Sequence, residues 1–209
     1  TMNNVTRLCP RNTADITLNK RYATNDRMLR YSRMLKDLFM DTMFAAKPKT
    51  NKNDRSIPGT DGKSARGYTC AQVFATEFGW VKPVLMSKKS DTHLAVKKIF
   101  KDYGVPPALI CDAAREQIFG EVRVICQQAG ADLTYLEKGT HNANRAERAI
   151  ATLKQGTKRD LHDNGSPAVF WCYALERRAA INNSIPRDNI SCQNQPPETV
   201  MTGKPTDIS

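Results

Sequence analysis

The sequence predicts an α/β fold, with a mixed sheet of about five strands flanked by helices. Three observations support this prediction. The chain has 209 residues, of which 40% are hydrophobic, and this is enough to bury a full core. Strand patterns come first, and helical and strand patterns then alternate. Long helical patterns follow the last strand pattern, which is typical of helices that cover the faces of a sheet.

The stretch "LKDLFMDTMFA" at 35–45 predicts the first strand. Its alternation places Leu38, Met40 and Phe44 on one face and Phe39, Asp41 and Met43 on the other. Because both faces are largely apolar, we expect a central strand.

Four further strands and two helices are predicted after a polar stretch. "YTCAQVFATEF" and "WVKPVLMS" read as two strands joined by a turn at Gly79, and with the first strand they predict an antiparallel meander. A helix then follows, with Ser90 or Asp91 as its N-cap candidate. The remaining elements are a strand at 107–114, a helix that ends at Gly130 and a strand at 132–139.

Two long helices complete the pattern. The first covers 142–165 and stops at Gly165. The second covers 166–183, with Ser166 as its cap and Pro167 at its first helical position. We therefore divide the chain into a basic, partly flexible lead-in at 1–33, a core at 34–185 with a long polar loop at 47–66, and a C-terminal extension at 186–209.

The charge balance favours a polyanionic partner. There are 32 Lys and Arg residues against 21 Asp and Glu, a net charge of +11. Nucleic acid is the commonest such partner, because each cation placed on a phosphate releases a counterion. No membrane role is expected, since no stretch approaches the ~20 apolar residues of a spanning helix. The six cysteines are scattered without a metal-ligand spacing and are expected to be free thiols.

Two aspartates occupy unusual places in this pattern. Asp41 lies in the apolar central strand, where an ionised carboxylate needs a bound cation or a hydrogen-bonding partner. Asp112 ends a buried strand, where open α/β sheets place their ligands. An ordinary turn or cap role remains the alternative for each.

Glu147 is the third candidate. On a helix it shares an edge with Lys154 and Lys158, beside an apolar face. A solvated face with a Glu–Lys contact is the alternative. If the three carboxylates meet, they could hold two divalent ions ~3.5 to 4 Å apart for phosphoryl displacement. Asp61 is a rival first ligand, but its turn sequence "PGTDGK" is a poor metal scaffold.

Several motifs resemble the integrase region of copia-type long-terminal-repeat retrotransposons, within the retroviral integrase superfamily. They are "MDTMFA", "RGYTCAQVFATEFGWVKPVLMSKKS", "GVPPALICDAAREQ", "NRAERAI" and "ETVMTGKPTDIS", and they occur in the family's order over roughly 35–209. The resemblance implies an RNase H-like fold. It also implies a catalytic and metal-binding triad of Asp41, Asp112 and Glu147 with two Mg²⁺ or Mn²⁺ ions.

The resemblance further implies how nucleic acid is bound. Asn144 and Lys154 match family positions, with Lys154 on the end of the element DNA. Lys158, from helical spacing, and Arg148 complete the predicted nucleic-acid-binding set. One departure is the Gln-Asn pair expected before the glutamate, which is Ala143-Asn144 here.

The activity implied is DNA integration, by processing of the 3′ ends of element DNA and joining of those ends to target DNA. The expected partners are double-stranded DNA and further copies of the chain on that DNA. The expected location is the nucleus, with a cytoplasmic particle stage. Two alternatives stay open, a catalytically inactive RNase H-like module that binds nucleic acid and an RNase H-type nuclease.

Overall fold

The computed structural model describes residues 32–45, 62–112, 120–136, 144–188 and 192–205. Its centre is one five-stranded sheet in the order β3-β2-β1-β4-β5. Antiparallel pairing joins β1 to β2 and β2 to β3, whereas β4 is parallel to both β1 and β5. The strands are β1 Leu38–Phe44, β2 Cys70–Ala75, β3 Val81–Met86, β4 Ala108–Asp112 and β5 Asp132–Leu136. The predicted mixed sheet with a central first strand is confirmed.

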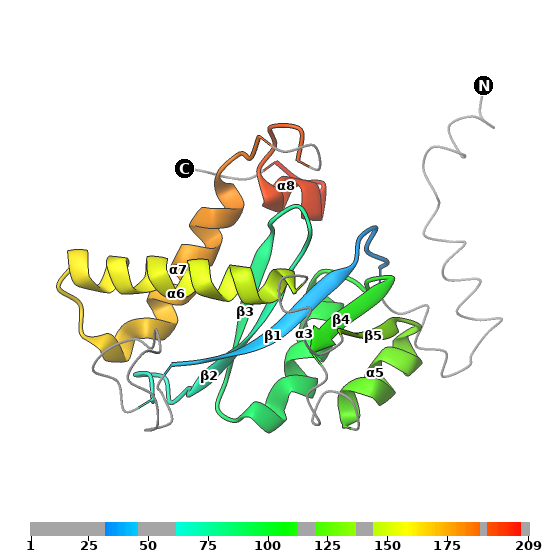
Figure 1. Ribbon diagram of the computed structural model, residues 1–209, viewed down its shortest axis with the longest axis horizontal. Coiled ribbons are helices and arrows are strands. Elements are labelled where there is room, and N and C mark those ends of the chain that lie inside the picture. Colours follow the sequence, from blue (N-terminus) through cyan, green and yellow to red (C-terminus); the bar gives the residue numbers. More distant parts are fainter. Residues whose placement is uncertain (1–31, 46–61, 113–119, 137–143, 189–191, 206–209) are drawn as a thin grey trace.

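Helices cover both faces of this sheet (Figure 1). α3 and α5 pack in one hydrophobic cluster, and α6 and α7 pack in another. The helices are α3 Thr92–Asp102, α5 Glu121–Ala129, α6 Arg145–Asp163, α7 Trp171–Ser184 and α8 Pro197–Thr202, with 3₁₀ turns at η2 Lys89–Asp91 and η4 Ala168–Phe170.

β1 contributes to both clusters, as its two apolar faces predicted. Leu38 and Met40 are buried in the cluster of α3 and α5, and Met43 is buried in that of α6 and α7. Phe44 is an exception, because it ends the strand and is 44% exposed. Asp41 alternates with Met43 and therefore points to the face that α6 covers.

Two glycines end helices as predicted, but the predicted start of α7 is wrong. Gly130 and Gly165 have φ values of 68° and 57°, which only glycine adopts without strain. Ser166 does not cap α7 and Pro167 is not its first helical residue. Pro167 has an extended ψ of 141° and precedes the 3₁₀ turn, whose Phe170 N–H donates to the Pro167 carbonyl, and the α-helix begins at Trp171.

Of the two predicted N-cap candidates for α3, Ser90 and Asp91, the structure has Asp91 at the cap position, but its side chain makes no cap bond. Its carboxylate instead accepts from the Lys88 N–H at 3.1 Å. The 3₁₀ turn η2 leads directly into α3, so the carboxylate serves the turn and not the helix.

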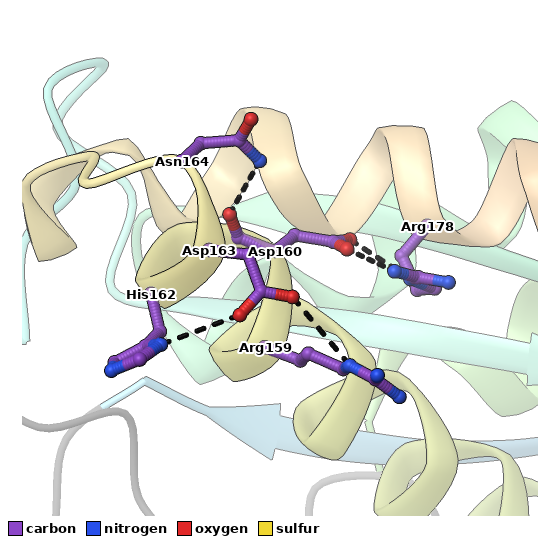
Figure 2. Close-up of polar contacts among 6 residues, drawn as sticks. All are labelled: Arg159, Asp160, His162, Asp163, Asn164 and Arg178. Carbon is purple, nitrogen blue, oxygen red and sulfur yellow. Dashed lines mark hydrogen bonds and ion pairs between the residues drawn. The ribbon is translucent and has the colours of Figure 1, made fainter.

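An ion pair fixes α6 against α7 (Figure 2). Arg178 Nε donates to Asp160 Oδ2 at 2.8 Å, and its Nη2 pairs with the other carboxylate oxygen. Gly156 makes room for this contact, since a Cβ there would lie 2.7 Å from Arg178 Cδ. Nearby, Arg159 and Asp163 form an exposed i, i+4 pair on α6. The helix that carries Glu147 is thus held in one orientation.

The described part of the C-terminal segment packs on the core. Glu198 of α8 accepts from Trp80 Nε1 at 2.8 Å and from Asn183 Nδ2 at 3.3 Å. Cys192 is buried in the cluster of α3 and α5. Most of the predicted lead-in and of the long loop lies outside the described residues, and the domain boundaries stay predictions. None of the five described cysteines is in a disulfide, and none of the described helices is long and apolar enough to cross a membrane.

Candidate active site

Asp41 lies near the middle of the central strand. It pairs with Val73 of β2 on one side, and the Met40–Cys111 pair joins β1 to β4 on the other. Its side chain is half-buried, and its Oδ1 accepts from the Thr42 N–H at 2.7 Å. The two neighbouring strands therefore hold this carboxylate on a rigid support.

The pKa of Asp41 is raised to about 6. Burial is the largest cause, and the Thr42 N–H bond opposes it. The negative charges of Asp112 and Glu147 raise the pKa further. The charges of two acids that are distant in the sequence therefore reach Asp41. A cation there would relieve their repulsion.

Asp112 ends β4, one residue beyond the Met40–Cys111 pair. Because β1 and β4 are parallel, this register puts Asp112 beside Asp41 at the carboxyl end of β4. The Asp112 carboxylate accepts from Asn144 Nδ2 at 3.1 Å. This hydrogen bond joins the end of β4 to the start of α6.

Asn144 is the N-cap of α6. Its Oδ1 accepts from the Ala146 N–H at 3.0 Å, while its Nδ2 donates to Asp112. The side chain is 0% exposed, so both ends of the amide bind protein. Asn144 was predicted to touch nucleic acid, and the structure instead shows it in a positioning contact. A direct contact of Asn144 with DNA stays a prediction that requires this pair of bonds to open.

We expect Asn144→Ser to separate the two contacts of this residue. A serine hydroxyl can still cap α6, but it is too short to replace the amide donor at Asp112. Stability should therefore stay within about 0.5 kcal/mol of the original protein, whereas catalysis should fall by roughly 10–100-fold. Asn144→Ala should lose both the helix cap and the contact with Asp112, so its catalysis should fall and its stability should decrease by about 1 kcal/mol. Denaturant unfolding and DNA joining assays on both variants check this, and equal activity in Asn144→Ser and the original protein would contradict it.

Glu147 lies in the first turn of α6, three residues after the cap, and is exposed. Among the described residues, no three His, Cys, Asp or Glu side chains stand close enough to hold a metal ion. The metal-binding role of Asp41, Asp112 and Glu147 stays a prediction. It fits the donor chemistry, because all three offer the carboxylate oxygens that Mg²⁺ prefers.

Lys154 and Lys158 share one edge of α6, as predicted. With Ala151 and Gln155 they line a shallow hollow of about 330 Å³. Both lysines are half-buried, so their stems lie on protein while the charged ends can reach outward. Arg148 lies elsewhere, in a separate hollow with Arg145. A role of these residues in binding nucleic acid stays a prediction.

One basic residue near the site was not predicted. The charge of Lys89, in η2, lowers the pKa of Asp41. Lys89 lies between β3 and α3 in the sequence, and no motif marks it. Only the packing of η2 near β1 reveals it. Asp61, the rival first ligand, lies outside the described residues.

Solved structures share this fold. Two are the HTLV-2 integrase catalytic core domain in complex with magnesium, in trimeric and dimeric forms, each 17% identical to the chain. Each matches 79% of the chain, over 95% and 98% of their own length, with TM-scores of 0.55 and 0.54. The chain has the fold of an integrase catalytic core.

A third match extends the comparison to an assembled complex. It is a simian T-cell lymphotropic virus intasome in complex with PP2A regulatory subunit B56 gamma, 14% identical, with a TM-score of 0.56 over 83% of this chain and 57% of that one. No protein-family model and no curated protein matches the sequence. The RNase H-like fold expected from the sequence motifs is thus confirmed by structure alone.

Proposed function

We propose that the chain is the catalytic core of a DNA integrase that processes the 3′ ends of element DNA and joins them to target DNA. The observation that carries the proposal is geometric. Within an integrase-core fold, the β1–β4 register sets Asp112 beside Asp41, and the Asn144–Asp112 bond holds the start of the helix that carries Glu147 against them. The basic edge of α6, with Lys154 and Lys158, continues from Glu147 and suits a phosphate backbone. The motifs listed above favour a copia-type element as its source.

Asp41, Asp112 and Glu147 would hold two Mg²⁺ or Mn²⁺ ions. When bound, such ions stabilise charge on the attacking and leaving oxygens of a phosphodiester. The chain supplies the support for this chemistry. β1 and β4 keep two carboxylates side by side, Asn144 orients Asp112, and the basic edge of α6 positions the substrate.

Water is the attacking group in end processing, and it cleaves a phosphodiester to leave a 3′ hydroxyl on the element strand. In joining, that hydroxyl attacks a target phosphodiester, so one phosphodiester bond forms as another breaks. No covalent bond to the protein is needed. We further propose that several copies act together on paired DNA ends and that the protein works in the nucleus after a cytoplasmic particle stage.

One observation favours a second candidate, a nucleic-acid-binding module without catalysis. Glu147 is exposed, and within the described ranges the acids do not form a ready metal cluster. A nuclease of RNase H type uses related metal chemistry and makes a third candidate. The integrase core would join DNA to DNA, the nuclease would cut an RNA–DNA hybrid, and the binding module would leave both substrates covalently unchanged.

A joining assay with an unbiased substrate pool separates these candidates. The full chain is mixed with Mg²⁺, a supercoiled plasmid and short duplexes with randomised ends and recessed 3′ hydroxyls, and the junctions are sequenced. We expect plasmid junctions with Mg²⁺ and none with EDTA, and no cutting of an RNA–DNA hybrid in parallel. Hybrid cleavage without junctions would indicate the nuclease. Salt-sensitive duplex binding without either reaction would indicate the non-catalytic module.

A further inference from the structure

A second basic hollow lies on α6, away from the edge that carries Glu147. It has a volume of about 320 Å³ and is lined by the β2–β3 turn, by α6 and by the segment after α7. Three arginines face it, namely Arg145, Arg148 and Arg187. We name this hollow the arginine groove. Arg145 and Arg148 are exposed, and Arg187 is half-buried.

The helix geometry separates the arginine groove from the acidic site. Arg145, Arg148 and Thr152 follow at i, i+3 and i+7, and all three line the groove. At about 100° per residue they occupy a face roughly 140° around α6 from Glu147. The remaining face, with Ile150 and Leu153, is buried against the sheet. One helix therefore presents two distinct polar faces.

Gly79 sets the position of Arg187. The Arg187 guanidinium lies directly against this glycine, so a Cβ there would be 2.5 Å from Nη1. The positive φ of Gly79, 91°, belongs to the turn between β2 and β3. The turn thereby fixes a planar cation at the wall of the groove, across from the arginines of α6.

The charge in the groove is unbalanced. Among the described residues that line it, Glu77 is the single acid, and its carboxylate pairs with Lys36 Nζ at 2.8 Å. Within the described part of the chain, the guanidinium groups of Arg145, Arg148 and Arg187 have no hydrogen-bond or ion-pair partner. Three guanidinium groups that line one hollow and have free donors match an anion with several oxygens.

We propose that the arginine groove of Arg145, Arg148 and Arg187 binds phosphates of a nucleic-acid duplex outside the reacting phosphodiester. The β2–β3 turn begins three residues beyond the Asp41–Val73 pair, or roughly 10 Å along the sheet. A phosphate held beside Arg187 at this turn is therefore too far from Asp41 to be the reacting one, so it adds affinity and sets the direction of the duplex. An arginine fork binds a phosphate with two parallel hydrogen bonds, and it can bind a carboxylate in the same way. The place of the groove favours a duplex, because Arg145 follows Asn144, whose side chain bonds Asp112 of the candidate active site.

Salt-dependent binding tests the proposal. The full chain is titrated with a fluorescent duplex of arbitrary sequence in EDTA, so that no chemistry occurs, over a series of KCl concentrations. Arg148→Gln combined with Arg187→Gln should reduce the slope of log K against log salt by about 2. Each tenfold decrease in salt concentration should therefore widen the difference in affinity from the original protein by about a hundredfold.

Two controls make the result specific. Arg123→Gln combined with Arg177→Gln removes the same charge from exposed sites outside the groove on α5 and α7 and should leave the slope unchanged. Arg148→Lys combined with Arg187→Lys should restore the slope but not the full affinity, because lysine lacks the planar fork. Thermal unfolding establishes that each variant is folded.

Three outcomes would overturn the proposal. They are an unchanged slope in the Gln pair and an equal fall of the slope in the control pair. The third comes from a parallel titration with fluorescent polyglutamate, and it is a loss of polyglutamate binding in the Gln pair while duplex binding stays intact. Because binding is measured without divalent ions, the result is independent of catalysis. If the arginine groove does not bind the duplex, the outcome of the joining assay is unaffected. Conversely, a chain that joins no DNA can still show the expected change in slope.

Discussion

Asp112→Asn is expected to reduce Mg²⁺-dependent DNA joining by on the order of 10³-fold or more, equivalent to about 4 kcal/mol in the barrier. The change removes a negative charge at the point where β4 meets the start of α6. An asparagine oxygen can still accept from Asn144 Nδ2, so the local fold should survive. The measurement is the yield of plasmid junctions, with duplex binding in EDTA measured on the same sample.

Asp132→Asn provides the matched control for this prediction. Asp132 is an exposed carboxylate at the start of β5, the strand next to β4, and it has no part in the candidate site. This variant should join DNA at the original rate. If Asp112→Asn retained joining, the acidic residues would not be the catalytic centre. If it lost duplex binding as well, the loss of joining would be a binding defect.

The second large effect concerns stability and pH at Asp41. The pKa of this carboxyl is about 6 in the folded protein, above its ordinary value of 3.8. The folded state therefore binds more protons than the unfolded state between these values, and Asp41 lowers the free energy of unfolding as pH rises from about 4 to about 6. Above pH 6 the full cost is present, at most about 3 kcal/mol.

Asp41→Asn should remove this cost and stabilise the protein at pH 8 by about 1–3 kcal/mol in the absence of divalent ions. With Mg²⁺ present, the original protein should instead be the more stable of the two. At a concentration a hundredfold above its dissociation constant, Mg²⁺ stabilises the original protein by about 2.7 kcal/mol, and it should have little effect on Asp41→Asn. Urea unfolding from pH 4 to pH 8, with and without Mg²⁺, checks both statements.

Asp188→Asn is the control for the pH series. Asp188 is exposed, so its replacement should leave the difference between pH 4 and pH 8 unchanged. A parallel pH dependence in Asp41→Asn and the original protein would show that the carboxyl of Asp41 is not the titrating group. An equal response of both proteins to Mg²⁺ would place the cation elsewhere.

The elements that could be predicted from the sequence are those with local causes. The alternation in β1 predicted two buried faces, and the glycines at 130 and 165 predicted helix ends. The start of α7 was mispredicted because Ser-Pro fits both a helix cap and the extended residue before a 3₁₀ turn. Local patterns cannot separate these two conformations.

The candidate site was only partly predictable. Asp41, Asp112 and Glu147 stand out in the sequence as acids in apolar or basic surroundings, and the charges of the other two raise the pKa of Asp41. Their joint catalytic role stays a prediction. Three contacts each join segments that are far apart in the chain. They are the hydrogen bond from Asn144 to Asp112, the nearness of Lys89 to Asp41, and the packing of the Arg187 guanidinium against Gly79. Such contacts depend on the tertiary packing, and residue spacing does not reveal them.

The acids differ in how firmly the molecule holds them. Asp41 belongs to the innermost strand, whereas Glu147 projects from an exposed helical turn. We expect the two aspartates to keep their positions in the free protein and the glutamate to join them last. Ordering the Glu147 side chain then costs about 1.5–2 kcal/mol of conformational entropy. Under the proposed function, such an arrangement would leave the centre incomplete in the free protein and complete it only after DNA is bound.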